Sequence, residues 1–218
     1  SVRQQQLGAV LEHRLSERTE LTGRVYAGAR DLDNALSIPR DAPPQDANGG
    51  MVKLDRVYQG AAFQVTHSGR MDAERGWRMT AGIEIDRMRE VRKGFRNEGG
   101  VQGDLRRDQR DTVSNRDAFA QLAIDVVTDW TVTAGARASR VSFRSADRFL
   151  GNGDDSGSAE YDALNPVLGI AWRTTPALNL YANFGRGFET PTFSELAYRW
   201  MDSGSGLNTE LNALRSRH

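Results

Sequence analysis

The chain contains no cysteine, which excludes disulfide bonds and cysteine-ligated metal sites. It also has no run of about 18 apolar residues, so no transmembrane helix is expected. Its 29 basic and 29 acidic residues cancel, and this balance argues against nucleic-acid binding, which normally requires a basic excess. The N-terminal stretch SVRQQQLGAV lacks a basic segment followed by an apolar one, so no signal peptide is expected.

Recognisable catalytic and metal-binding arrangements are missing as well. His13, His67 and His218 lie far apart and show no ligand spacing. The acidic stretch Gly151–Ser158 lacks the ordered carboxylate spacing of a calcium loop, and Gly185–Gly187 lacks the helix that follows a phosphate-binding loop. No Ser–His–Asp set or carboxylate pair can be identified from residue order. We therefore predict that the chain is not an enzyme and holds no metal or cofactor.

Apolar and polar residues alternate with a period of two along much of the chain, as in β-strands with two different faces. One segment sets Trp77, Met79, Ala81, Ile83 and Ile85 against Arg78, Thr80, Gly82, Glu84 and Asp86. No charged residue falls on any of the apolar faces. Together with a weaker N-terminal run, QLGAVLEH, these segments predict about eight antiparallel strands.

The connections between these strands alternate in length. Short turns are expected near Ser16–Thr19, Ser68–Arg75, Thr128–Asp129 and Thr174–Leu178. Long polar connections are expected near Asp31–Asp55, Glu90–Asn115 and Ser145–Glu160, and after Gly187. Short turns at one end and long loops at the other are typical of an up-and-down barrel in an outer membrane.

A soluble antiparallel sheet with one wet face would alternate in the same way. Three features favour the membrane barrel. Several runs reach the length of about 10 residues that a tilted membrane strand needs, and their apolar faces are rich in alanine, which fills a sandwich core poorly. Trp77, Trp130 and Trp172 all lie beside short turns, as in an aromatic belt. The alternatives are a small eight-stranded outer-membrane barrel that acts as an anchor or pore, and a soluble β-sandwich binding module.

One segment, NPVLGIAWRTTPALNLYANFGRGFETPTFSEL, resembles TonB-dependent outer-membrane receptors. These proteins carry a hairpin of the form N-P-x-x-G-x-x-W/Y-x-x-T/S-x-x-L-x-L-Y-x-x-x-x-x-G-F-x-x-P-x-x-x-E-L. The matching residues are Asn165, Pro166, Gly169, Trp172, Leu178, Leu180, Tyr181, Gly187, Phe188, Pro191, Glu195 and Leu196. The tail GLNTELNALRSRH is similar to the family's segment that leads into the next strand.

The resemblance implies an all-β fold, an antiparallel up-and-down transmembrane β-barrel with about eight of about 22 strands. Residues 1–218 would be part of that barrel domain, without the family's plug domain and without a complete barrel. One strand would rise from a periplasmic turn at Thr175–Ala177, and an extracellular loop would follow Pro191. The implied location is the bacterial outer membrane, and the implied function is uptake of a ferric siderophore or a similar scarce nutrient. The implied partners are outer-membrane lipid and lipopolysaccharide and, in a full-length protein, TonB and the plug domain.

Two sets of charged residues are candidate functional sites. A basic stretch within Arg89–Asp111, expected to be an external loop, would steer anionic ferric siderophores by long-range attraction; the alternatives are a solvated loop or contact with lipopolysaccharide phosphates. Its candidate ligand-binding residues are Arg89, Arg92, Lys93, Arg96, Arg106 and Arg107. The second set would line the lumen and either contact a plug or neutralise one another: Arg24, Arg78, Glu84, Asp125, Arg137 and Arg173.

Overall fold

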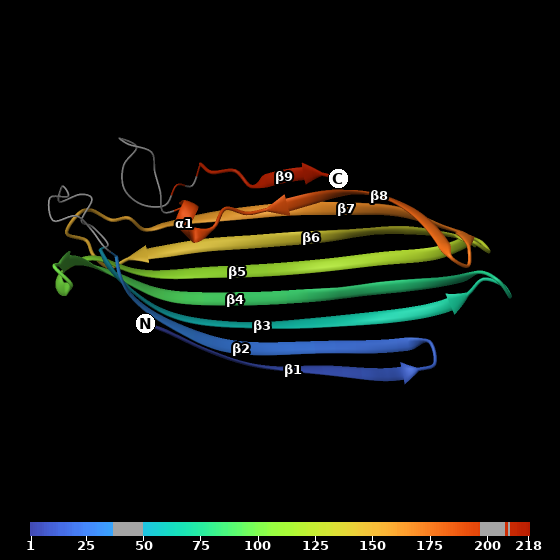
Figure 1. Ribbon diagram of the computed structural model, residues 1–218, viewed down its shortest axis with the longest axis horizontal. Coiled ribbons are helices and arrows are strands. Elements are labelled where there is room, and N and C mark those ends of the chain that lie inside the picture. Colours follow the sequence, from blue (N-terminus) through green and yellow to red (C-terminus); the bar gives the residue numbers. More distant parts are fainter. Residues whose placement is uncertain (37–49, 197–207, 209) are drawn as a thin grey trace.

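A single antiparallel sheet makes up most of the computed structural model, which describes residues 1–36, 50–196, 208 and 210–218 (Figure 1). The strands lie side by side in chain order. Their bounds are β1 Val2–Ser16, β2 Thr19–Ala35, β3 Met51–Arg70, β4 Gly76–Glu98, β5 Val101–Val127, β6 Trp130–Asp147, β7 Gly157–Thr175, β8 Leu178–Glu189 and β9 Leu214–Arg217. The predicted connections across 37–49 and 197–207 lie outside the described residues, as does part of the predicted tail segment.

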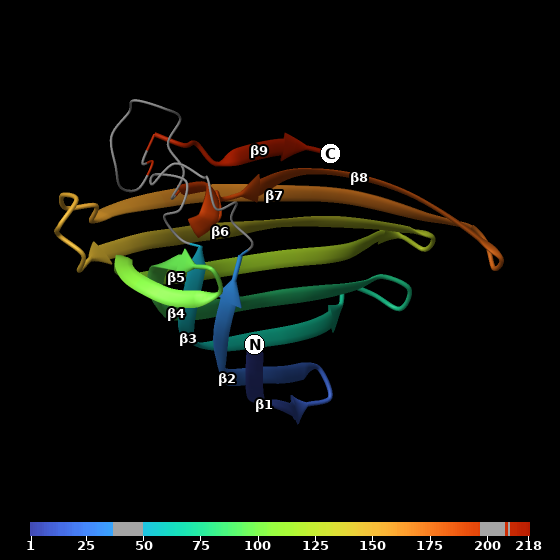
Figure 2. The same ribbon diagram turned by 60° about the vertical axis from the view of Figure 1, so that its left-hand side comes forward.

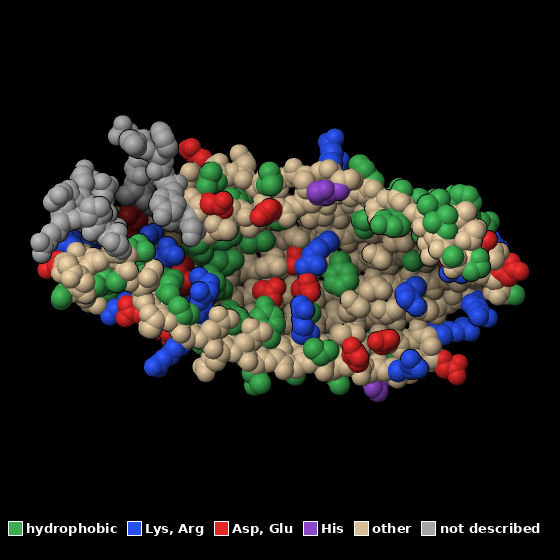
Figure 3. Space-filling view, in the orientation of Figure 1, with side chains coloured by type: hydrophobic (Ala, Val, Ile, Leu, Met, Phe, Trp, Pro, Cys, Tyr) green, Lys and Arg blue, Asp and Glu red, His purple; other side chains and the backbone are tan. Residues whose placement is uncertain are grey.

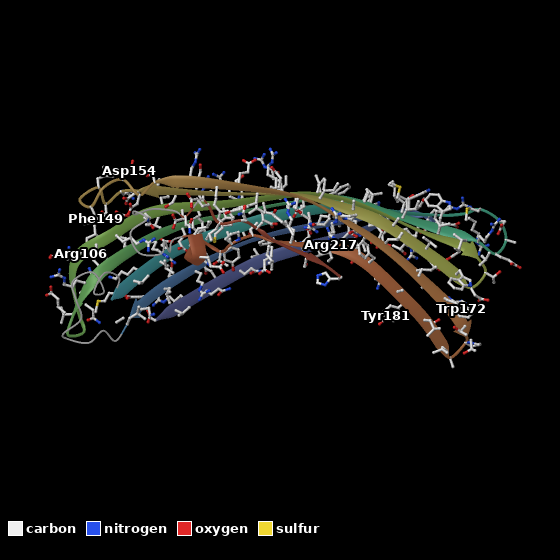
Figure 4. The ribbon with its side chains drawn as sticks, turned by 90° about the horizontal axis from the view of Figure 1, so that it is seen from above. Arg106, Phe149, Asp154, Trp172, Tyr181 and Arg217 are labelled. Carbon is white, nitrogen blue, oxygen red and sulfur yellow. The ribbon has the colours of Figure 1, made fainter. Side chains whose placement is uncertain are left out.

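The sheet is bent into an open arch, which Figures 2 and 4 show from two directions. β1 and β9 form its two edges and are not paired with each other in the described ranges. The prediction of an all-β, antiparallel, up-and-down fold is confirmed. A closed eight-stranded barrel is not what the structure shows, because the sheet stays open between its first and last strands.

A short helix, α1 (Phe193–Leu196), lies on the concave side of the arch (Figure 4). Its Phe193 ring packs edge-on against Phe143 of β6, with ring centroids 5.3 Å apart, which identifies the face that Phe143 belongs to. No helix among the described residues is long and apolar enough to cross a bilayer.

Cross-strand register assigns the side chains of each strand to one of two faces. Ile83 of β4 lies opposite Phe63 of β3 and Ala118 of β5 on the convex face. The next residue, Glu84, lies opposite Ala62 and Asp117 on the concave face. Ile83 and Phe63 remain 52% and 47% exposed, so no second layer covers the apolar side as it would in a β-sandwich.

The three tryptophans among the described residues lie at the short-turn end of the convex face. Trp130 of β6 stacks on Trp172 of β7, with ring centroids 5.0 Å apart and planes 10° apart. Trp77, the second residue of β4, lies beside His67 of β3, with ring centroids 5.4 Å apart. This is the placement that an aromatic belt at one membrane interface requires.

The prediction of a long polar loop between Glu90 and Asn115 is wrong. β4 continues to Glu98 and β5 starts at Val101, and the turn between them is Gly99–Gly100, with φ angles of 67° and 97° that favour glycine. The cross-strand pairs continue through Arg92 with Gln109 and Lys93 with Asp108. Both faces of this extension are mostly polar, so its composition resembles that of a loop. Its backbone nevertheless continues the hydrogen-bonded pairing of β4 with β5.

The expected change from strand to extracellular loop is also corrected. Pairing of β8 with β7 ends at Gly185, and β8 then pairs with β9 up to Glu189, so the described residues form nine strands where about eight were expected, and β8 stays in the ladder past Gly185 and Gly187. Past Pro191 the chain forms α1, which turns onto the concave face. The predicted turn around Pro176 is confirmed, because β7 ends at Thr175 and β8 starts at Leu178.

Neighbouring residues of β5 provide a matched test of the two faces. Leu122 lies on the convex face and Gln121 on the concave face. We expect Leu122→Lys to lower the free energy of unfolding by about 1–3 kcal/mol, because a lysine on the lipid face of a barrel is poorly solvated and Leu122 lies between the interface and the midplane. Gln121→Lys should change it by less than about 0.5 kcal/mol. Urea unfolding of the protein in phospholipid vesicles measures both, and equal losses would contradict the assignment of faces.

Candidate functional site

A network of charged side chains crosses the middle of the concave face, and Figure 3 shows acidic and basic groups side by side there. Arg24 of β2 contacts Glu84 of β4 at 3.1 Å. Arg137 of β6 also donates to Glu84, and its Nη2 lies 2.6 Å from Asp117 Oδ2 in β5. Two guanidinium groups thus meet two carboxylates, and the network of these four residues, the mid-wall network, has no net charge.

The mid-wall network is supported by its neighbours on the concave face. Asn115 Nδ2 donates to Asp117 at 2.7 Å, and the Arg137 guanidinium lies 5.9 Å from the centroid of the Phe119 ring. This ring lies flat because its neighbour on β4 is Gly82, where a Cβ would come within 2.7 Å of Phe119 Cζ. The Phe119 ring therefore lies along the wall and does not fill the space inside the arch.

A second contact that lies along the wall is found nearer the Gly99–Gly100 turn. Tyr26 of β2 donates to Asp86 Oδ1 of β4 at 2.5 Å across the intervening Gly60 of β3. A Cβ on Gly60 would come within 2.5 Å of the Tyr26 ring, so only glycine allows the bond to pass over β3. Polar groups of the wall are again satisfied by the wall itself.

Farther toward the Gly99–Gly100 turn, Glu90 is one of two equally enclosed acids of the concave face; it and its cross-strand partner Asp111 each have 3% of their surface exposed. Arg56 Nε donates to Glu90 Oε2 at 2.7 Å, and Arg92 Nε lies 3.4 Å from Glu90 Oε1. Arg107 donates to Gln109 Oε1 at 2.6 Å on the same face. An enclosed carboxylate flanked by two guanidinium groups keeps its charge compensated.

The six residues expected to line the lumen all lie on the concave face. Arg24, Glu84 and Arg137 belong to the mid-wall network, while Asp125 accepts from Thr131 Oγ1 at 2.7 Å and from the Gly76 amide at 3.2 Å. The remaining two, Arg78 and Arg173, lie near the short turns and have no ion-pair partner among the described residues.

The six candidate ligand-binding residues do not form one loop patch. Arg92 and Arg107 lie on the concave face, and Arg89 and Lys93 lie on the convex face. The last two, Arg96 and Arg106, lie where register shifts interrupt the alternation near the turn. The hairpin thus separates residues that a loop would have gathered.

The residues of the motif that resembles TonB-dependent receptors lie mainly in β7 and β8. Asn165 lies opposite Arg137 on the concave face, and Pro166 is the first β7 residue beyond the ladder with β8. Pro191 follows the end of β8, and the other motif positions in these strands are Gly169, Trp172, Leu178, Leu180, Tyr181, Gly187 and Phe188.

The motif ends in α1, which is capped and packed onto the wall. Thr192 N donates to Glu195 Oε2 at 2.7 Å, and Glu195 N donates back to Thr192 Oγ1 at 3.3 Å, a capping box. Leu196 is fully buried against a cluster that includes Phe143 and Phe193. The amide and hydroxyl of Thr192 both donate to Glu195 and lower the pKa of its carboxyl below the ordinary value.

Sequence reasoning missed several partners in this wall, notably Asp117, Asp86, Tyr26 and Glu90. The period-two pattern contains the information, because Asp117 has the opposite parity to Ala118, just as Glu84 has to Ile83. Which acid meets which arginine depends on cross-strand register, and that cannot be read from a single strand. In the described ranges no three His, Asp or Glu side chains gather in a metal-binding arrangement.

Comparison with known families agrees with this two-faced architecture. The family model described as TonB dependent receptor-like, beta-barrel, matches residues 1–217. The chain belongs to this family, which consists of transport receptors rather than enzymes and is located in the bacterial outer membrane. In outer-membrane barrels the short turns are periplasmic and the longer connections extracellular, which orients the arch.

Solved structures show the same fold. The ferric citrate transporter FecA aligns with a TM-score of 0.68 and 17% identity over 88% of this chain and 28% of its own. The ferric-catecholate import receptor Fiu of E. coli K12 gives 0.73 and 12% identity over 99% and 37%. The copper transporter OprC gives 0.73 and 15% identity over 99% and 35%. The chain thus spans about a third of the length of these proteins.

The mid-wall network predicts a specific coupling. Arg137→Gln leaves Asp117, whose side chain is 2% exposed, without its cation, and we expect unfolding to become easier by about 1–3 kcal/mol. Adding Asp117→Asn should recover part of this loss, because the buried charge is then removed; the coupling should be about 0.5–3 kcal/mol. Arg173→Gln, which removes a concave arginine without an ion-pair partner, is the matched control and should change stability by less than about 0.5 kcal/mol. Equal effects of Arg137→Gln and Arg173→Gln would contradict the network.

The capping box predicts a pH dependence of α1. Because the pKa of Glu195 is lowered in the folded state, its contribution is fully present above the ordinary value of 4.5 and is lost as pH falls through the folded value. Hydrogen exchange at the Leu196 amide, corrected for intrinsic rates, should show protection that decreases from pH 6 to pH 3. Glu195→Gln keeps an acceptor but cannot titrate, so it should abolish this dependence; an unchanged pH dependence in that variant would rule out Glu195 as its cause.

Proposed function

We propose that this chain is part of the barrel wall of a receptor that takes up a ferric siderophore, or another scarce metal complex, across the outer membrane. The observation that carries the proposal is the concave face, which is polar, open and charge-compensated within itself through the mid-wall network. Such a face suits a barrel interior that borders water or a polar domain, whereas a wall that packed a dry core would be apolar.

The similar solved proteins support a metal-containing cargo, because they are a ferric citrate transporter, a ferric-catecholate import receptor and a copper transporter. In the full-length protein a plug domain would occupy the space inside the barrel, and energy delivered through TonB would displace it. The mid-wall network then has a defined role: it neutralises the wall so that a plug can slide past without leaving buried charges unpaired.

The extracellular part of the concave face is where an incoming ligand would first meet the wall. Arg92 and Arg107 point to that side, so we assign ligand steering to these two of the six basic candidates. Long-range attraction would concentrate anionic ferric complexes there before binding. Arg89 and Lys93 face the opposite way and have no part in this step.

Uptake measurements test the proposal. Deleting the gene should abolish uptake of radioactive iron from one member of a panel of ferric citrate, a ferric catecholate and a ferric hydroxamate. Restoring the full-length receptor with Arg92→Gln and Arg107→Gln together should slow association of that complex about tenfold at low ionic strength, because steering is electrostatic.

Lys93→Gln is the matched control for this pair, since Lys93 follows Arg92 in β4 but lies on the convex face. It should leave association unchanged at equal surface abundance. Normal uptake of every complex, and of copper, after gene deletion would refute the proposed transport function.

A further inference from the structure

The convex face changes from apolar to basic within two neighbouring cross-strand rows of the sheet. On β4, β5 and β6 the apolar convex run ends at Ile85, Ala118 and Ala138. The next convex residue on each of these strands is an arginine: Arg87, Arg116 and Arg140. Arg116 and Arg140 share a cross-strand row with Ile85, and Arg87 lies one row farther on, so the change on three adjacent strands marks a boundary of the convex apolar surface.

Five convex arginines beyond this boundary are exposed and have no ion-pair or hydrogen-bond partner among the described residues. We call them the arginine girdle: Arg87, Arg89, Arg110, Arg116 and Arg144. Arg140, at the same level, is different, because it lies 2.7 Å from Asp162 and 3.2 Å from Glu160 of β7. The girdle therefore presents uncompensated positive charge beside a neutralised arginine.

The centre of the girdle has a definite geometry. Thr112 of β5 lies directly between Arg89 of β4 and Arg144 of β6 in one cross-strand row. Adjacent strands are about 4.8 Å apart, so the two arginines start about 10 Å from each other and both reach the space over Thr112. Arg110 is a diagonal neighbour of both. Guanidinium groups that converge in this way suit a phosphate, which accepts two parallel hydrogen bonds from each fork.

The height of the girdle indicates which phosphate it meets. Trp77 and Ile85 bound the convex apolar run of β4, and their separation of eight residues corresponds to about 27 Å along the strand. A strand tilt of about 40° reduces this to roughly 20 Å, close to the apolar band of a membrane barrel. The girdle thus begins at the headgroups of the outer leaflet and faces away from the barrel interior, so transported ligand does not contact it.

We propose that the arginine girdle binds the phosphate groups of outer-leaflet lipopolysaccharide, with Arg89 and Arg144 holding one phosphate over Thr112. Charge complementarity supports this occupant, because five unpaired cations at a headgroup interface are stabilised by anionic lipid. The neighbouring hydroxyls of Ser114 and Ser142 lie in the next cross-strand row and can donate to the same headgroup.

The test uses the whole receptor, purified in detergent with EDTA so that no divalent cation bridges phosphate to protein. Binding is measured with lipopolysaccharide and with the same lipopolysaccharide after enzymatic removal of its lipid A phosphates. Arg89→Gln with Arg144→Gln should weaken binding of the phosphorylated form about 30-fold, since each arginine near a membrane surface contributes about fivefold. Removing the phosphates should weaken binding to wild type by a similar factor and should add little further loss in the double variant.

Arg140→Gln is the matched control, because that arginine is already neutralised by Asp162 and Glu160; it should change affinity less than threefold. Equal affinity of wild type for both lipopolysaccharides, or full affinity of the double variant, would overturn the assignment. Competition by micromolar inorganic phosphate would also overturn it, because it would indicate a site for free anions. So would a double variant that loses a co-purifying protein partner while its affinity for lipopolysaccharide stays unchanged. Uptake of the ferric complex should stay within twofold of wild type, so this proposal and the transport proposal fail separately.

Discussion

The ladder of backbone hydrogen bonds is the constraint on which the rest of the structure depends. In a single layer each amide and carbonyl is satisfied by a neighbouring strand, and every side chain is then left with one of two directions. A shift of one residue would exchange Ile83 with Glu84 and place a carboxylate in the apolar band. Burial against a second layer contributes little, since Met51, Phe143 and Leu196 are the buried hydrophobic residues among those described.

The two faces handle charge in opposite ways, and this difference assigns their roles. On the concave face acids and bases from β2, β4, β5 and β6 meet one another, so the wall needs no external counter-ion at its middle. On the convex face the girdle gathers cations from β4, β5 and β6 and leaves them for an external anion. A lumen wall and a lipid-facing wall are expected to differ in this sense.

Much of this architecture could be predicted from the sequence, because alternation survives wherever one face is apolar. The alternation of apolar and polar residues correctly indicated a strand through Trp77–Asp86, and the sequence also indicated the turn at Pro176. It failed where both faces are polar, as between Glu90 and Asn115, because loop composition and strand composition are then the same. It also failed at α1, whose position depends on packing of Leu196 and Phe193 against Phe143, a contact between distant parts of the chain. The charge partners required register, which a single sequence does not contain.

The most direct test of the central claim is a single-cysteine scan along β5, which is possible because the chain has no cysteine of its own. Spin labels at Ala118, Ala120, Leu122 and Ile124 are compared with labels at Phe119, Gln121 and Ala123 in lipid vesicles. The account predicts a period of two, with oxygen in the lipid relaxing the first set and a water-soluble nickel chelate relaxing the second. Labels of the first set that are shielded from both reagents, or equal relaxation at all positions, would contradict it.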